Sequence, residues 1–342
     1  MNRVAALTGH TLFWPVAVWV VLLLANVAFT PGFLSLRIRE GHLYGSLIDI
    51  LLFGAPLILV ALGMTVVVAT GGIDLSVGAT VAISGALACH LIAGGHGLIV
   101  ALPAAVGASL LLGLWNGLLV TRLGIQPIIA TLILMVAGRG IAQLITGGQI
   151  ITVDSGAYKM IGGGYWLGLP FSILLVAAAL AATLLLTRRT ALGLLLESVG
   201  GNAEASRLVG IRSSGLIVLA YVFCGLCAGI AGLMISSNTL SADGNQAGLW
   251  IELDAILAVV LGGTALTGGR FSLSGTVVGA LIIQTLDTTI YTAGIPPRTT
   301  LVFSAAVVTV VCLLQSPAFR AKFRRRPPAL PASASAEQEV TA

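Results

Sequence analysis

The chain has 342 residues, of which 57% are apolar and only 8% are charged. A soluble domain carries about 25% charged residues, and the apolar residues here would fill about ten membrane spans of about 20 residues each. Together with a mean hydropathy of +1.06, this composition excludes a cytosolic enzyme, a disulfide-stapled secreted domain and a disordered regulator. It predicts an all-α, polytopic bundle of transmembrane helices.

Apolar windows predict about ten spans in chain order. They cover 11–30, 48–69, 75–94, 98–120, 127–146, 169–187, 215–237, 251–266, 272–293 and 299–315. The first is long enough for a full span and has no clear cleavage site behind it, so we expect it to be retained. The eighth is short and interrupted by glycine, which leaves a count of nine open.

The basic residues orient this bundle, because cytoplasmic loops carry an excess of Lys and Arg. With both termini inside, the cytoplasmic set is Arg3, Arg122, Arg188, Arg189, Arg207, Arg212, Arg270, Arg320, Lys322, Arg324, Arg325 and Arg326. The outer set is Arg37, Arg39, Lys159 and Arg298, while Arg139 lies within the fifth span. This orientation places twelve basic residues on the cytoplasmic side and four on the outer side, and the excess predicts that both termini are cytoplasmic.

Three segments lie outside the spans. Residues 147–168 form a glycine-rich outer loop, and 188–214 form the largest cytoplasmic loop. Residues 1–316 thus make one transmembrane domain, followed by a tail, 317–342, with a basic cluster and a Pro/Ala/Ser-rich end. We expect the basic cluster to contact membrane lipid and the rest of the tail to be disordered.

The chain lacks the motifs of catalysis and of cofactor binding. Neither lysine follows glycine or precedes serine or threonine, so a P-loop is excluded. Cys224 and Cys227 lie one turn apart within an apolar run, which favours packing over metal or redox chemistry. We therefore expect no enzyme activity and no cofactor. The net charge of +5 comes from loops and the tail, so membrane contact explains it better than nucleic acid.

A few polar residues interrupt the spans and are candidates for a solute path, since ionisable groups in a membrane are functional by default. For Arg139, extension to the interface is an equal alternative. The neutral amides suit sugar hydroxyls because they both donate and accept, but they also hold helices together. The candidate path residues are Asp74, Asn116, Gln126, Thr131, Arg139, Gln143, Gln284 and Asp287.

Several motifs occur together in order along the chain. Ala69–Ala79, of sequence ATGGIDLSVGA, resembles the signature of ribose-type sugar permeases of ATP-binding-cassette importers. The resemblance continues at Leu114–Gly117, Gln126-Pro127, Thr131-Leu132, Arg139-Gly140, Gly200–Asn202, Val209–Ile211, Glu252–Ile256 and Gly262–Thr264, and so covers about residues 45–295. Gly45–Leu51 and Gly268–Phe271 are similar to the galactofuranose-type branch. In the ninth span, Asp287-Thr288 stands where the family usually has Asn-Gly.

This resemblance implies the permease subunit of an importer in a bacterial inner membrane, which translocates a galactofuranose- or ribose-like monosaccharide. It implies three partners: a separate ATPase subunit, a periplasmic or extracellular sugar-binding protein, and a second permease copy or a sister chain. The rival hypothesis is an ion-coupled secondary transporter, which would need intramembrane carboxylates as relays. This chain has few of them.

The resemblance also places ATPase coupling in the large cytoplasmic loop. We expect Ala203–Leu208 to form a short helix along the membrane, with Asn202 as its N-cap and Gly210 as its terminator. An ordinary solvated connector is the alternative. The predicted coupling residues are Gly200, Gly201, Asn202, Ala203, Glu204, Ala205, Arg207, Gly210 and Ile211.

Two further features concern glycine. We expect Asp74 to be the N-cap of the third span, with Gly71 and Gly72 permitting a sharp turn of the chain into that span.

Two Thr-Gly-Gly segments form a candidate internal repeat. Thr70–Gly72 precedes Gly78 by the same spacing as Thr267–Gly269 precedes Gly275. Transporters often contain repeats, so internal duplication and chance both remain open.

Overall fold

The computed structural model describes residues 12–292, apart from 31 and 40, and six isolated residues beyond them. The described part contains these helices: α2 (Phe13–Phe29), α3 (Ser46–Ala69), α4 (Val77–Ala93), α5 (Leu98–Arg122), α6 (Pro127–Thr146), α7 (Gly156–Gly163), α8 (Phe171–Arg189), α9 (Leu192–Gly201), α10 (Ala203–Leu208), α11 (Ser213–Thr239), α12 (Ile251–Leu261) and α13 (Leu273–Thr292). Its short strands are β1 (Arg37–Arg39), β2 (His42–Tyr44), β3 (Ile151–Thr152), β4 (Tyr165–Trp166), β5 (Leu169–Pro170) and β6 (Ser241–Ala242).

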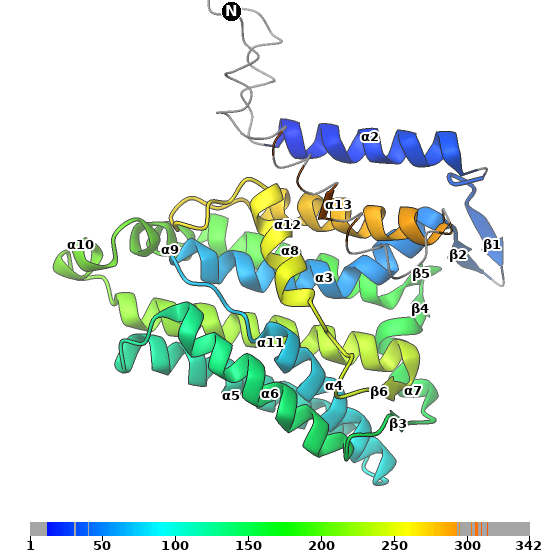
Figure 1. Cartoon of the computed structure of the whole chain (residues 1–342), viewed down its shortest axis with the longest axis horizontal. Coiled ribbons are helices and arrows are strands. Elements are labelled where there is room, and N and C mark those ends of the chain that lie inside the picture. Colours follow the sequence, from blue (N-terminus) through cyan, green and yellow to red (C-terminus); the bar gives the residue numbers. More distant parts are fainter. Residues whose placement is uncertain are drawn as a thin grey trace, which may run out of the picture.

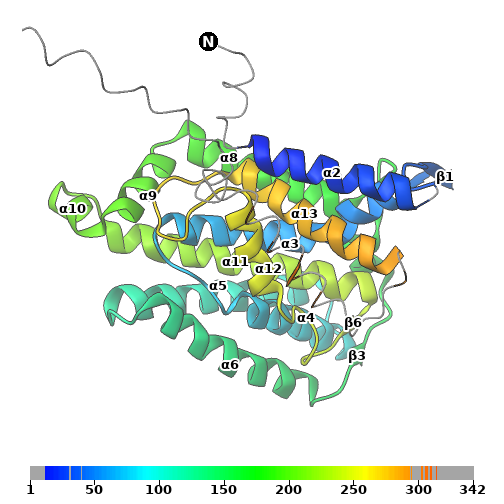
Figure 2. The same cartoon turned by 45° about the horizontal axis from the view of Figure 1, so that its top comes forward.

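The helices form a layered bundle with α11 and α3 at its centre (Figure 1). On one side α11 packs against α4 and α5, and α6 packs outside them. On the other side α3 packs against α8, α12 and α13, and α2 packs against α13 (Figure 2). The most apolar stretch of α3 is 78% buried, whereas that of α8 is only 17% buried. The outer helices therefore present apolar faces to lipid, as a membrane bundle requires.

Six of these helices are long and apolar enough to cross a membrane: α3, α5, α6, α8, α11 and α13. Together with α2, α4 and α12, they fall within nine of the ten predicted windows. The eighth window is only partly helical, because α12 ends at Leu261 and Gly263 adopts a positive φ of 87°. The tenth window, 299–315, lies almost entirely outside the described residues, and the tail 317–342 lies wholly outside them.

Close contacts through glycine hold the central helices together. A Cβ placed on Gly225 of α11 would lie 2.5 Å from the carbonyl oxygen of Ser109 on α5, and one on Gly117 of α5 would lie 2.9 Å from the Cα of Val218. Only small residues permit helix backbones to approach so closely in a membrane. Similarly, a Cβ on Gly63 of α3 would lie 2.9 Å from the Cα of Cys224.

The two ends of the bundle differ. The short antiparallel pairs β1–β2, β3–β6 and β4–β5 lie with α7 at one end, and α9 and α10 lie at the other (Figure 1). The side chain of Tyr158 on α7 is fully buried, and its hydroxyl lies 2.6 Å from Ser236 Oγ on α11. The strand end is thus fixed to the core, while α10 projects from the bundle.

Candidate functional site

The helix predicted at Ala203–Leu208 is confirmed as α10. Asn202 caps it as predicted, because its Oδ1 accepts a hydrogen bond of 2.9 Å from the backbone N–H of Ala205. At the other end Gly210 has a φ of +90°, and its N–H donates to the carbonyl of Arg207. Asparagine and glycine satisfy the free backbone groups at the two ends of a helix, so this local sequence specifies both boundaries.

Hydrogen bonds to α9 and α11 hold α10 in position on one side, while its other side is exposed. Ser206 is buried and donates to the carbonyl of Ser198 on α9 at 2.9 Å, and Ser213 of α11 donates to the carbonyl of Ala203 at 3.0 Å. Leu208 and Val209 are 80% and 77% exposed. The outward surface of α10 therefore combines these two apolar side chains with the exposed ion pair between Arg207 and Glu204, whose Nη2 and Oε1 atoms lie 2.7 Å apart.

A backbone junction joins α9 to both Thr-Gly-Gly segments, which lie against each other in space. The N–H of Gly269 donates to the carbonyl of Ala69 at 3.0 Å. A Cβ on Gly268 would lie 2.9 Å from the backbone N of Gly71. A Cβ on Gly200, the penultimate residue of α9, would overlap the carbonyl oxygen of Ala69 and lie 2.5 Å from the N of Gly269. We call these residues the glycine junction.

The predicted role of Asp74 as the N-cap of the third span is wrong. Helix α4 begins at Val77, with Ser76 at its N-cap position. Asp74 Oδ1 instead accepts hydrogen bonds from the backbone N–H of Ser76 at 2.9 Å and from its hydroxyl at 2.6 Å. This is the Asx-type turn that aspartate forms just before a helix. The sharp approach is confirmed, since Gly71 has a φ of +81°.

Two of the candidate path residues, together with a tyrosine that the sequence did not indicate, are buried and hold the 73–76 segment. Asn116 of α5 donates to Ser76 Oγ at 2.8 Å and to Asp74 Oδ1 at 3.4 Å. Thr131 of α6 and Tyr221 of α11 donate to the carbonyl of Ile73 at 3.4 and 3.3 Å. The segment between α3 and α4 is therefore fixed by three separate helices.

This network gives a stability prediction. Replacing Asn116 with leucine removes the amide that donates hydrogen bonds to Asp74 and Ser76. Losing a buried hydrogen bond lowers the free energy of unfolding by about 1–3 kcal/mol. We expect Asn116→Leu to lower the thermal unfolding midpoint of the detergent-solubilised protein. Gln143→Leu is the matched control, because Gln143 is an exposed amide on α6. Equal midpoints for the two variants would contradict the prediction.

Arg139 does not simply extend to the interface. It is half-buried, and its Nη1 donates to the carbonyls of Ala247 at 2.7 Å and Asn245 at 3.5 Å, in the loop that leads into α12. It also interacts electrostatically with Glu252. Glu252 is 2% exposed, and its Oε2 has no hydrogen-bond partner within the described part of the chain. The sequence indicated Glu252 only as the first residue of the Glu252–Ile256 motif, not as a partner of Arg139.

The remaining candidate path residues lie apart from the 73–76 segment and from Arg139. Gln126 is an exposed residue at the start of α6, and Gln143 is exposed near its far end. Gln284 on α13 packs against α3, where a Cβ on Gly54 would lie 3.1 Å from its Cγ. Asp287, also on α13, lies close enough to Asp254 of α12 for electrostatic interaction. Among the described residues, no group of three or more His, Cys, Asp or Glu side chains is placed to hold a metal.

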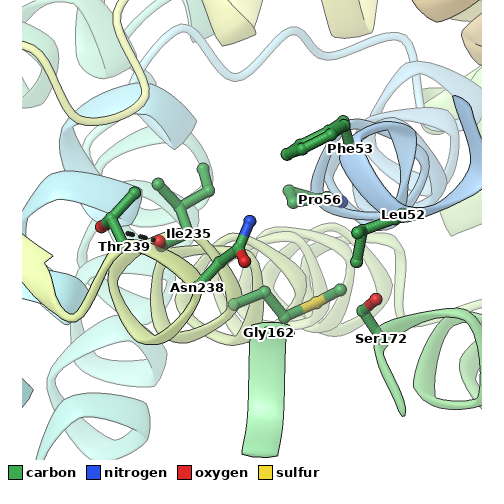
Figure 3. A pocket seen from close by; sticks show the side chains of 9 residues that line it. Leu52, Phe53, Pro56, Gly162, Ser172, Ile235, Asn238 and Thr239 are labelled. Atoms are coloured by element: carbon green, nitrogen blue, oxygen red, sulfur yellow. Dashed lines mark hydrogen bonds between the residues drawn. The ribbon is translucent and has the colours of Figure 1, made fainter. Parts of the chain in front are cut away.

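A cavity of about 190 Å³ lies between the first turns of α3, the end of α11, α7 and the start of α8. Asn238 extends from α11 toward Pro56 and Phe53 of α3 (Figure 3). Ser172 of α8, also in the lining, is fully buried. None of the candidate path residues lines this cavity, which lies at the end of α11 opposite to α10.

Comparison with known proteins identifies the family. Residues 46–312 match the model of a family described as "Branched-chain amino acid transport system / permease component". The chain belongs to this permease family. The match includes α3 to α13, and therefore both the glycine junction and the cavity.

The chain is also similar to several sugar permeases. It is 49% identical over 312 residues to the galactofuranose transporter permease protein YtfT of Escherichia coli, covering 90% of this chain and 91% of that one. It is 39% identical to the fructose import permease FruF of Bifidobacterium longum over 92% and 90% of the two chains. It is also 39% identical to the ribose import permease RbsC of Bacillus subtilis over 75% and 80%. No solved structure matches the chain significantly.

Proposed function

We propose that the chain is the membrane-spanning permease subunit of an ATP-binding-cassette importer for a galactofuranose- or ribose-like monosaccharide. The observation that carries this proposal is the 49% identity to a galactofuranose permease across nine-tenths of both chains. The comparisons do not favour an ion-coupled secondary transporter. A chain whose sequence contains no P-loop depends on a partner to hydrolyse ATP.

The similarity to bacterial sugar permeases supports a placement in a bacterial inner membrane, and the distribution of basic residues supports the orientation of the chain in it. In this placement about ten spans cross the membrane, and both termini and α10 lie in the cytoplasm. Residues 1–316 are the permease domain, with its coupling loop at 188–214, and 317–342 are a cytoplasmic tail. The strand end of the bundle then faces outward, where a sugar-binding protein docks.

This topology predicts opposite labelling of two positions. A single cysteine at Lys159, which is exposed on α7, should react with a membrane-impermeant maleimide added to intact cells. A single cysteine near Arg326, in the tail, should react only after the cells are opened. Labelling of both positions from outside would contradict a cytoplasmic tail.

The coupling proposal rests on α10. Its exposed face, with Ala205, Leu208 and Val209, seats in a groove of the ATPase subunit, and the glycine junction carries the resulting motion to α3 and α12. The candidate path residues, in a dimer with a second copy or a sister permease, serve solute passage or hold the helices that line it. The partner set therefore comprises the ATPase, the sugar-binding protein and the second permease.

The energy source tests the proposed function. We expect import by the assembled complex to persist when an uncoupler collapses the ion gradients and to stop when ATP is depleted. The measurement is uptake of labelled sugar into cells that express the permease with its neighbouring ATPase and binding-protein genes. Import that stops with the uncoupler while ATP remains high would support the ion-coupled alternative instead.

A further inference from the structure

The cavity at the strand end of the bundle is lined by two polar side chains that make no hydrogen bond to the described residues. Ser172 is 0% exposed, and its Oγ has no hydrogen-bond partner within the described part of the chain. The Asn238 side chain likewise makes no hydrogen bond to any described residue, whereas the neighbouring Thr239 hydroxyl donates to the carbonyl of Ile235 (Figure 3). Leaving a hydroxyl buried without a partner is costly, so Ser172 indicates an occupant that forms hydrogen bonds. The half-buried amide of Asn238 is free to bond to the same occupant.

The other walls of the cavity are apolar. Phe53 and Pro56 of α3 lie across from Asn238 (Figure 3). Met234 of α11 also lines the space. Ligand sites combine such apolar walls with a few polar groups that fix orientation. A sugar ring presents C–H groups to an aromatic or apolar wall and hydroxyls to an amide. An acyl chain would fill the apolar part but would offer nothing to Ser172.

The size and place of the cavity also favour a small polar solute. Its volume of about 190 Å³ is smaller than the roughly 300–1,000 Å³ of pockets for drug-sized ligands. It lies at the end of α11 remote from α10, and its walls come from α3 and α11, the two central helices. The end of α3 away from this cavity meets the glycine junction.

We propose that this cavity is a binding subsite for one monosaccharide, entered from the outer side, with Asn238 and Ser172 as hydrogen-bonding residues and Phe53 as the stacking wall. The subsite receives the sugar released by the binding protein before the bundle opens inward. This inference rests on the proposed function, because the identity of the solute and the outward orientation both come from it.

The test is protection of an introduced cysteine. An Ile235→Cys variant, which places a thiol on the cavity wall and keeps both Asn238 and Ser172, is reconstituted in nanodiscs. It is alkylated by a small hydrophilic maleimide in the presence of D-galactose, D-ribose or raffinose. We expect one of the two monosaccharides to slow alkylation by about tenfold at ten times its dissociation constant, as mass action requires. Raffinose, a trisaccharide too large for the cavity, should have no effect. The Lys159→Cys variant is the control, since this exposed position lies outside the cavity.

A second variant and a second measurement separate the possible failures. Ser172→Ala in the Ile235→Cys background should raise the apparent dissociation constant of the protecting monosaccharide by about fivefold, the equivalent of one hydrogen bond. ATP-driven uptake of the same two monosaccharides by the complex with unchanged permease tests the proposed function independently. If uptake of either occurs but neither protects, the cavity is not a sugar subsite and a lipid chain or water fills it. If the complex takes up neither D-galactose nor D-ribose, the proposed function is contradicted, and the subsite proposal that rests on it is contradicted with it.

Discussion

Gly200→Ala should abolish most import while the protein still reaches the membrane. The added methyl group would overlap the carbonyl oxygen of Ala69, which already accepts the hydrogen bond from Gly269. Overpacking costs about 1–3 kcal/mol, which corresponds to about one to two decades in the population of the correctly packed junction. Because all the groups in contact are backbone, no side chain can rotate away to relieve the overlap.

The neighbouring glycine provides a matched control. A Cβ on Gly201 would meet nothing within 4 Å, so Gly201→Ala should import at close to the unchanged rate. The measurements are ATP-driven sugar uptake into proteoliposomes and the amount of permease in the membrane fraction. Equal uptake by the two variants, at equal amounts of protein, would show that the junction does not carry coupling.

Ala205→Arg should uncouple ATP hydrolysis from import. Ala205 is exposed on α10 beside Leu208, and our coupling proposal buries this face in the ATPase. An unpaired charge in an apolar interface costs several kcal/mol, so we expect uptake to fall by more than about tenfold. The fold of α10 should survive, because the N-cap bond uses the backbone N–H of residue 205, which arginine keeps, and the contact with α9 is made by Ser206.

Ala205→Ser is the control for this position, since it keeps the small size and adds no charge. The two variants are compared by sugar uptake, by ATP hydrolysis and by docking of the binding protein from outside, which should be unchanged in both. An Ala205→Cys variant should also cross-link to the ATPase subunit. Full import by Ala205→Arg, or absence of that cross-link, would contradict a coupling role for α10.

The features that could be predicted from the sequence are those that depend on neighbouring residues. Hydropathy windows located nine helices, because the length of an apolar run is a local property. Helix α10 was predicted with both of its ends, because Asn202 and Gly210 cap it through bonds that span three residues. The same kind of local inference was wrong for Asp74, since spacing alone does not distinguish a cap from a turn that ends before the helix.

The features that could not be predicted depend on contacts between distant parts of the chain. Arg139 and Glu252 interact although more than a hundred residues separate them. Ser172 is the second residue of an ordinary apolar helix. Only the packing of α8 reveals that its hydroxyl is buried and has no partner among the described residues. The two Thr-Gly-Gly segments could be recognised as similar, but their mutual contact arises only when α3 and α12 pack together.

The glycine junction also limits how this permease can change over evolution or in the laboratory. Because its closest contacts join main chain to main chain, no side chain can take the place of the glycines at positions 200 and 268 without displacing backbone, and the glycine at position 71 has a φ of +81° that other residues rarely adopt. These positions should therefore stay glycine in any working variant, even where the residues around them differ. Shortening or lengthening the loop between α12 and α13 by one residue would be far more damaging than many substitutions in the lipid-facing helices, since it would displace Gly269 from Ala69.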